Sequence, residues 1–386
     1  MKLLHTSDWH IGQQFFSFSR EEEHLSFFSQ LADIVGQERP DIMVVSGDVF
    51  HTSTPAADAL RLFVDGLLSV CRRHPAMRTI VTAGNHDSAM RIEADKALWE
   101  AEGVSIVGVF QRNEEGQLDP NKFVKVIPGV AIVAAVPYIS PRFADYGSIF
   151  CQIEAEVERL NADGLPVVYM AHTATGMVDD GVGGVDTVPL EKFGHAYDYL
   201  ALGHIHMPQT IKQSEGRARY CGSPIAISFD ETHPHGVDIV EIGRHGSALQ
   251  ISTVKIHQTR GVLTLPKSPA PLSDVLSQFE ALPADCTDYV RLNVLVEDYL
   301  PADTQERAAE IANDKKCRLC QIMSTPKHSA DSQQTKAMTL SEFNVLTPFD
   351  IAQKEYRRRH DGTDMPTDIA ELLRDVIASV EADKQA

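Results

Sequence analysis

Short runs of apolar residues alternate with amphipathic stretches along the first hundred residues of this chain. The runs at 2–7 and 42–45, and a β-branched run at 79–82, are typical of buried strands. Between them, residues 20–37 and a segment that begins near Thr54-Pro55 repeat apolar residues at helical spacing. This alternation of strands and helices predicts an α/β sandwich with helices on the faces of its sheets.

Further apolar runs predict five later strands, at 104–109, 130–136, 166–171, 199–202 and 237–242. The polar segment 111–121 and the glycine-rich segment 176–184 are expected to form surface loops.

The pattern changes near residue 260. The proline-rich run 265–271 predicts a linker, and the helix and strand patterns after it predict a small α+β domain. Two amphipathic helices are expected near the C-terminus. We therefore expect three parts: a large domain at 1–260, the α+β domain at 272–325 and a helical segment at 337–386.

Composition restricts the class of protein. The 386 residues are 43% hydrophobic and 23% charged, as in an ordinary globular protein, and no run of about 18 apolar residues predicts a membrane span. The six cysteines are scattered and the N-terminus has no signal-peptide pattern, which favours a cytoplasmic protein. The net charge of −19 argues against coating DNA by bulk charge, but it permits a localised basic groove.

Polar side chains with metal-binding chemistry follow several of the predicted strands. Residues just past strand ends gather at one rim of an α/β sheet. The fragments are Asp8-Trp9-His10, Gly47-Asp48, Gly84-Asn85-His86-Asp87, His172 and Gly203-His204-Ile205-His206. Each fragment alone is weak evidence for a metal site, because polar residues at strand ends often only cap a turn. Together they supply the imidazole, carboxylate and amide donors of a site for two divalent ions such as Mn, Fe or Zn.

These fragments resemble those of the calcineurin-like metallophosphoesterase superfamily. The segments 5–12, 46–50 and 201–206, together with Tyr220-Cys221-Gly222-Ser223-Pro224 and Ser228-Phe229-Asp230-Glu231, are similar to its DNA-repair nuclease branch. The resemblance covers essentially the whole chain and is looser after about residue 235. It implies a two-sheet sandwich flanked by helices, with a small α+β capping domain and C-terminal helices.

The resemblance also implies a role for each site residue. Asp8, His10 and His206 would hold one Mn²⁺ ion; Asn85, His172 and His204 would hold the other, with Asp48 between them, although other divalent ions are possible. His86 would assist the leaving oxygen, and His51 matches a position that handles the DNA phosphate during exonucleolytic cutting. Asp87 is expected to secure its turn. Arg217 and Arg219 are weaker candidates for contacts with DNA.

The implied activity is that of a DNA nuclease. The protein would be a homodimer that works with a large ATPase. It would cut double-stranded ends and hairpins of DNA with a hydroxide activated by two metal ions. The chain has no Gly-x-x-x-x-Gly-Lys-Ser/Thr motif, so any ATP dependence would come from that partner. The dimer would use helices at 55–74 and 88–101, although the apolar stripe of the first also suits the chain's own core.

Three alternatives remain open from the residues themselves. The apolar stripes at 340–351 and 369–380 would dock on the ATPase or fold back on this chain. The arginines at 357–359 would touch DNA or an acidic partner, or form a solvated face. Two other functions compete with that of a DNA nuclease. The chain would be a small-molecule phosphodiesterase or phosphatase of the same fold, or a non-catalytic metal-binding scaffold that regulates the ATPase.

Overall fold

A computed structural model describes residues 1–110, 119–142, 145–175 and 187–327, with short stretches between 349 and 377. The chain divides into two compact units, Met1–Ser324 and Thr325–Ala386. None of the described helices is both long and apolar enough to cross a membrane.

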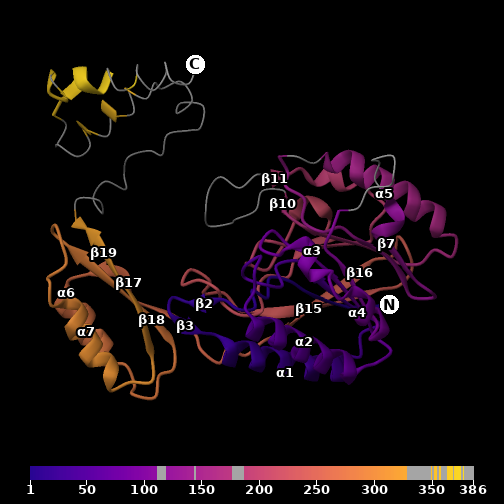
Figure 1. The fold of residues 1–386 in the computed structure, drawn as a ribbon, viewed down its shortest axis with the longest axis horizontal. Coiled ribbons are helices and arrows are strands. Elements are labelled where there is room, and N and C mark those ends of the chain that lie inside the picture. The colour runs from indigo at the N-terminus through magenta and orange to yellow at the C-terminus, as the bar shows by residue number, and fades with distance from the viewer. Residues whose placement is uncertain are drawn as a thin grey trace. The chain divides into compact units, whose positions relative to one another are not determined.

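Two mixed sheets form the body of the first unit (Figure 1). In the first sheet, β1, β4, β5 and β6 are parallel and β15 runs antiparallel to β1. Its strand order is β16 (Leu249–Lys255), β15 (Gly236–Ile242), β1 (Lys2–Thr6), β4 (Ile42–Ser46), β5 (Arg78–Thr82) and β6 (Val104–Val107). The second has the order β13 (Gln209–Thr210), β14 (Ala218–Tyr220), β12 (Tyr199–Gly203), β9 (Val167–His172), β8 (Ala131–Ala135) and β7 (Val124–Ile127).

The two sheets pack face to face, with helices outside them. Successive side chains of a strand point to opposite faces, so β1 buries Leu4 toward one side and Leu3 toward the other. Leu4 packs in the cluster formed with α1 (Glu21–Glu38) and α2 (Ala57–Arg73), whereas Leu3 packs in the cluster that joins both sheets and α5 (Tyr146–Leu160). The predicted α/β sandwich flanked by helices is therefore confirmed.

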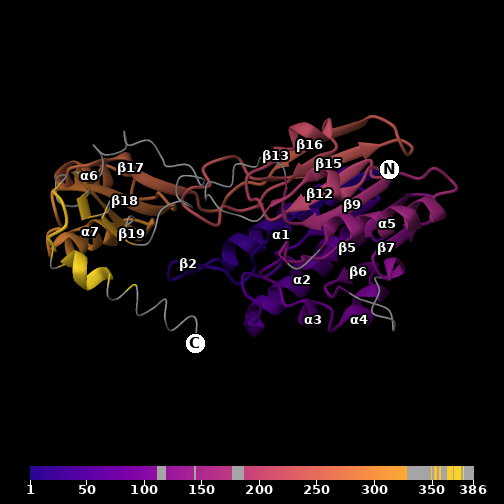
Figure 2. The same ribbon diagram turned by 90° about the horizontal axis from the view of Figure 1, so that it is seen from above.

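Short elements complete the body of this unit. Helices α3 (Ala89–Ile92) and α4 (Lys96–Ala101) pack at the β6 edge of the first sheet (Figure 2). The remaining short elements are two strand pairs, β2 (Gln14–Phe15) with β3 (Phe18–Ser19) and β10 (Ala174–Thr175) with β11 (Thr187–Val188), and three 3-10 turns, η1 (Pro120–Lys122), η2 (Leu190–Phe193) and η3 (Lys212–Ser214).

The predicted small α+β arrangement is present at the end of the first unit. Its sheet has the order β17 (Val262–Ala270), β18 (Tyr289–Val296), β19 (Arg318–Pro326), and α6 (Leu272–Glu280) and α7 (Thr304–Asn313) lie on one face of it (Figure 1). The linker prediction for 265–271 was wrong, because these residues form most of β17. This edge strand shifts its register between Leu265 and Ala270, and prolines are tolerated at such irregular edges.

Several finer predictions also needed correction. Two apolar residues within the helical repeats at 20–37 and after Thr54-Pro55 do not lie on a buried face: Leu25 of α1 is 54% exposed, and Val64 of α2 is 39% exposed. The strands β7, β14 and β16 were missed: β7 and β14 have only four and three residues, and no residue of β16 is buried, so none of the three forms a buried apolar run. The predicted loop at 176–184 and the apolar residues 340–346 lie outside the described residues. Described residues between 349 and 357 and between 367 and 377 are helical.

Candidate metal centre

The seven predicted ligands meet where five strands end. Asp8 and His10 follow β1, Asp48 follows β4 and Asn85 follows β5, all in the first sheet. His172 ends β9, and His204 and His206 follow the neighbouring β12 in the second sheet. The site thus lies at the carboxyl ends of parallel strands of both sheets, where backbone geometry gathers polar side chains.

One group of donors contains Asp8, His10 and His206. Their ligand atoms all lie within 4.8 Å of one another. The Nε2 atoms of His10 and His206 are 3.3 Å apart, and Nε2 of His206 is 3.9 Å from an Asp8 oxygen. Asp8 is also fixed by the backbone N–H of His204, which donates to both of its carboxylate oxygens at 3.1 and 3.2 Å.

A second group of donors surrounds Asp48 and Asn85. Nε2 of His172 is 3.4 Å from Oδ2 of Asp48 and 3.0 Å from Oδ1 of Asn85, and Nδ1 of His204 is 2.9 Å from the same Asn85 oxygen. Asp48 Oδ2 also lies 3.7 Å from Nε2 of His10. Asp48 therefore connects the two groups.

The backbone is strained at these positions. Seven described non-glycine residues have positive φ, and four of them are Asp8 (54°), His10 (45°), Asp48 (48°) and His204 (99°). Such conformations cost on the order of 1–3 kcal/mol each and persist where surrounding structure enforces them. The strain aims four side chains of this cluster inward.

The glycines of the motifs are required by close packing. A Cβ at Gly84 would lie 2.1 Å from Oδ1 of Asp48, and a Cβ at Gly203 would lie 1.9 Å from the carbonyl oxygen of Ser46. Gly84 therefore allows the segments after the neighbouring strands β5 and β4 to approach closely, and Gly203 allows the end of β12 in the second sheet to approach the end of β4 in the first.

The donor set fits divalent cations. Nδ1 of His172 donates to the Ser46 carbonyl at 2.8 Å, and Nδ1 of His206 donates to the Glu231 carboxylate at 3.0 Å. When a ring of this pair gives up its second proton, as it must to bind a metal, Nε2 carries a lone pair and faces oxygens that have no proton to offer. A cation satisfies these converging lone pairs, and the proton held on the other nitrogen is the usual arrangement of a metal-binding histidine.

The pKa values show how strongly burial and neighbouring charges act on these donors. Burial lowers the pKa of His10 well below its usual range, and burial and then His172 lower the pKa of His204 to about 4. For His172, burial is outweighed by attraction to Asp48, which raises the pKa to about 9. Burial of Asp48 is likewise outweighed by His172, which lowers the pKa of that carboxyl.

The two histidines predicted to act on substrate stand beside the donors. Nδ1 of His86 donates to the backbone oxygen of His51 at 2.8 Å, which leaves Nε2 of His86 free of that bond. The rings of His51 and His86 stack with centroids 5.6 Å apart, and each ring also contacts that of His10. Asp87 accepts from three backbone N–H groups and secures the turn, as expected.

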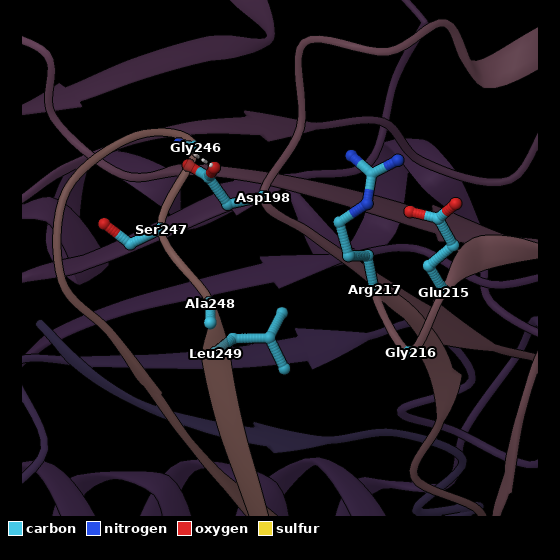
Figure 3. Close-up of a pocket in the computed structure, with 8 residues that line it drawn as sticks. All are labelled: Asp198, Glu215, Gly216, Arg217, Gly246, Ser247, Ala248 and Leu249. Atoms are coloured by element: carbon cyan, nitrogen blue, oxygen red, sulfur yellow. Dashed lines mark hydrogen bonds between the residues drawn. The ribbon is translucent and has the colours of Figure 1, made fainter.

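The two arginines predicted to contact DNA have intramolecular partners. Arg219 forms an ion pair with the buried Asp238 at 2.6 Å and also donates to two threonine hydroxyls. Arg217 packs over Tyr197 and lines a cavity of about 450 Å³ with Asp198, which precedes β12 (Figure 3). His204 follows the other end of this five-residue strand, so it lies six residues from Asp198, or roughly 20 Å at the rise of an extended strand. The placement of these arginines does not support their predicted role.

Glu231 is a site residue whose role the sequence reasoning missed. Its carboxylate holds His206, yet it lies 25 residues further along the chain and follows no predicted strand. Its place beside Phe229 in a motif was the only signal that could have drawn attention to it.

The sequence matches two family models. The model of the calcineurin-like phosphoesterases covers residues 1–208, and a model described as the type 5 capsule protein repressor C-terminal domain covers residues 259–360. The match of the first model includes all seven candidate ligands.

Known relatives match most of the chain. The D-subunit of the nuclease SbcCD from Rhodobacter capsulatus is 31% identical over 314 residues, which cover 73% of this chain and 76% of that protein. The protein of the same name from Escherichia coli K12 is 28% identical over 78% of this chain and 79% of its own length. The one from Bacillus subtilis is 30% identical over 62% of this chain and 66% of its own length.

Proposed function

The chain belongs to the calcineurin-like phosphoesterase family, and from this premise we propose that it is the nuclease subunit of an SbcCD-type complex. Its reaction is the hydrolysis of phosphodiester bonds in DNA, at double-stranded ends and in hairpins. The observation that carries the proposal is the convergence of seven oxygen and nitrogen donors, from five strand ends, around Asp48. Relatives that match most of the chain are named as nuclease subunits.

The proposed cofactors are two Mn²⁺ ions. Asp8, His10 and His206 would hold one, and Asn85, His172 and His204 would hold the other, with Asp48 within reach of both groups. Bound divalent ions of this kind polarise a phosphoryl oxygen and supply a nucleophile near neutral pH.

The chain's own residues would orient the reaction. Nδ1 of His86 donates to the His51 carbonyl, so Nε2 is the ring atom left to act on the substrate. In the imidazolium form of the ring, Nε2–H would give its proton to the leaving oxygen, and the ring would return to the neutral form with Nδ1 still protonated. His51 is stacked on that ring and is half-buried, which keeps it at the edge of the site where a DNA phosphate would arrive. Cys221, whose thiol lies 3.2 Å from the Ser7 hydroxyl beside the site, is buried, and burial raises the pKa of its thiol, so this cysteine is not prepared to act as a nucleophile.

The proposed partners follow from the relatives' names and from exposed apolar residues. The subunit would work in the cytoplasm with the ATPase SbcC, which would contact the helical C-terminal segment. There Ile369 and Leu372 are 43% and 66% exposed. A homodimer would use α2 and the α3–α4 region, where Val64, Met90 and Leu98 expose 39%, 79% and 72% of their surface.

The test is cleavage of a labelled DNA hairpin by the purified chain with Mn²⁺, alone and with its SbcC. Mn²⁺-dependent cleavage that is lost in His86→Ala supports the proposal. Turnover of a small chromogenic phosphodiester without DNA cleavage would instead identify a small-molecule enzyme. Metal binding without any cleavage would identify a scaffold.

A further inference from the structure

One carboxylate, that of Glu231, contacts the ring nitrogen of His206 that faces away from the site. Oε1 of Glu231 accepts from Nδ1 of His206 at 3.0 Å, so Nε2 of this ring is turned toward His10 and Asp8. The Glu231 side chain is only 10% exposed, and His206 is 28% exposed. His206 is thus the more accessible residue of the pair, and its orientation depends on this contact.

The second oxygen of Glu231 is fixed as well. Oε2 accepts from the Ser223 hydroxyl at 2.9 Å and from the backbone N–H of Ile227 at 3.1 Å. Both carboxylate oxygens are therefore occupied by donors, and the carboxylate cannot rotate away from His206 without breaking bonds. Its role is positional, because it faces the rear nitrogen of the ring rather than the centre of the site.

The small α+β domain contacts the turn that carries Glu231, at Phe229 and Asp230. The guanidinium of Arg291, on β18, stacks over the ring of Phe229 at 4.9 Å and forms an ion pair with Asp230 at 3.1 Å. Nε of Arg291 also donates to Thr264 on β17, which fixes the side chain within its own sheet. Phe229 further packs against Phe15, which contacts Tyr289 of β18.

We propose that Glu231 is the positioning residue of His206, and that Arg291 braces the turn which carries it. Docking of the small domain then sets how firmly His206 is presented to a metal ion. This inference rests on the proposed function, because it takes His206 to be a metal ligand. It adds a route by which a partner or substrate that moves the small domain changes metal affinity.

The experiment measures Mn²⁺ binding to the full chain by calorimetry, with the electron paramagnetic resonance spectrum of the bound ions as a second readout. Glu231→Gln removes the charge and leaves one contact of the carboxylate unmade. We expect it to weaken one Mn²⁺ site by about 10- to 100-fold, as for other groups that orient metal-binding histidines. His206→Ala weakens that same site, and adding Glu231→Gln to His206→Ala causes no further loss.

Arg291→Ala is expected to weaken the same site by about two- to five-fold, as the loss of a partly exposed ion pair predicts. Arg307→Ala is the matched control, since Arg307 pairs with Asp303 inside the small domain and the affinity should stay unchanged. Unchanged binding in Arg291→Ala would overturn the bracing role.

The outcomes separate this inference from the proposed function. Normal binding in Glu231→Gln, with binding weakened in His206→Ala, overturns the positioning role alone. Equal losses from Glu231→Gln with and without His206 also overturn it. Normal binding in His206→Ala overturns the ligand assignment itself. If Glu231→Gln does not fold, Ser223→Ala removes one of the carboxylate's three bonds, and an unchanged affinity there would count against the inference.

Discussion

Gly84→Ala adds one methyl group where the loop after β5 passes closest to Asp48. The new Cβ would lie 2.1 Å from Oδ1 of Asp48 and 2.2 Å from its backbone nitrogen. Real Cβ atoms essentially never approach a heavy atom closer than 3.0 Å, so one side must move by about 0.9 Å or more. The displaced Asp48 oxygen is also the acceptor of the His86 N–H.

The size of the effect follows from that displacement. Overpacking of this kind costs about 1–3 kcal/mol of unfolding free energy. A shift of about 1 Å in a reacting geometry costs on the order of 100-fold in rate. We therefore expect Gly84→Ala to lower kcat/KM for Mn²⁺-dependent hairpin cleavage by about 100-fold or more, in a protein that still folds.

The control is Gly243→Ala. A Cβ at Gly243 would meet only the Ser247 side chain, with its hydroxyl at 3.3 Å, so activity and stability should stay near those of the unchanged protein. Denaturant unfolding of both variants separates lost folding from lost activity. If a folded Gly84→Ala cleaves within three-fold of the unchanged protein, the argument from close approach is wrong.

Three further predictions concern single residues. His86→Ala should lower cleavage by about 10²- to 10⁴-fold and leave Mn²⁺ binding intact in calorimetry; loss of the metal would refute its assignment to proton transfer. His5 is fully buried, and burial lowers its pKa from 6.5 to about 3, so the folded state binds fewer protons than the unfolded state between those values. The neutral His5 ring therefore contributes about 4–5 kcal/mol to the free energy of unfolding. This contribution should be complete above pH 6.5 and lost as the pH falls toward 3. The difference in unfolding free energy between His5→Leu and the unchanged protein should change over that window, and a constant difference would contradict the reasoning. Arg219→Ala should cost about 3–5 kcal/mol of stability, because it leaves the buried Asp238 unpaired. If Arg219→Ala instead lowered the affinity for DNA without lowering stability, the prediction that Arg219 contacts DNA would be supported.

The strands that carry the site could be predicted because each is short, almost fully buried and followed at once by polar residues. β1, β4 and β5 have largely apolar runs, and the carboxyl ends of parallel strands must share one edge. Asp8, Asp48 and Asn85 could therefore be brought together from the sequence alone. The fold class follows from the same alternation of strands and helices.

The parts that could not be predicted depend on contacts between distant segments. Arg219 was predicted to contact DNA because it follows the Gly-His-x-His motif closely in the sequence. In the structure it lies on β14 beside β12, and its side chain pairs with Asp238. The proline-rich segment at 265–271 has the composition of a linker, and only its pairing with β18 makes it a strand. Glu231 reaches His206 through a turn whose path no local pattern describes.

The stoichiometry of Mn²⁺ bound to the full chain tests the central claim most directly. Calorimetric titration at neutral pH should give two ions per chain, falling to one when His172→Ala removes a donor of the second group and leaves Asp8, His10 and His206 in place. Two ions bound equally well without His172, or no ion bound by the unchanged protein, would contradict the account.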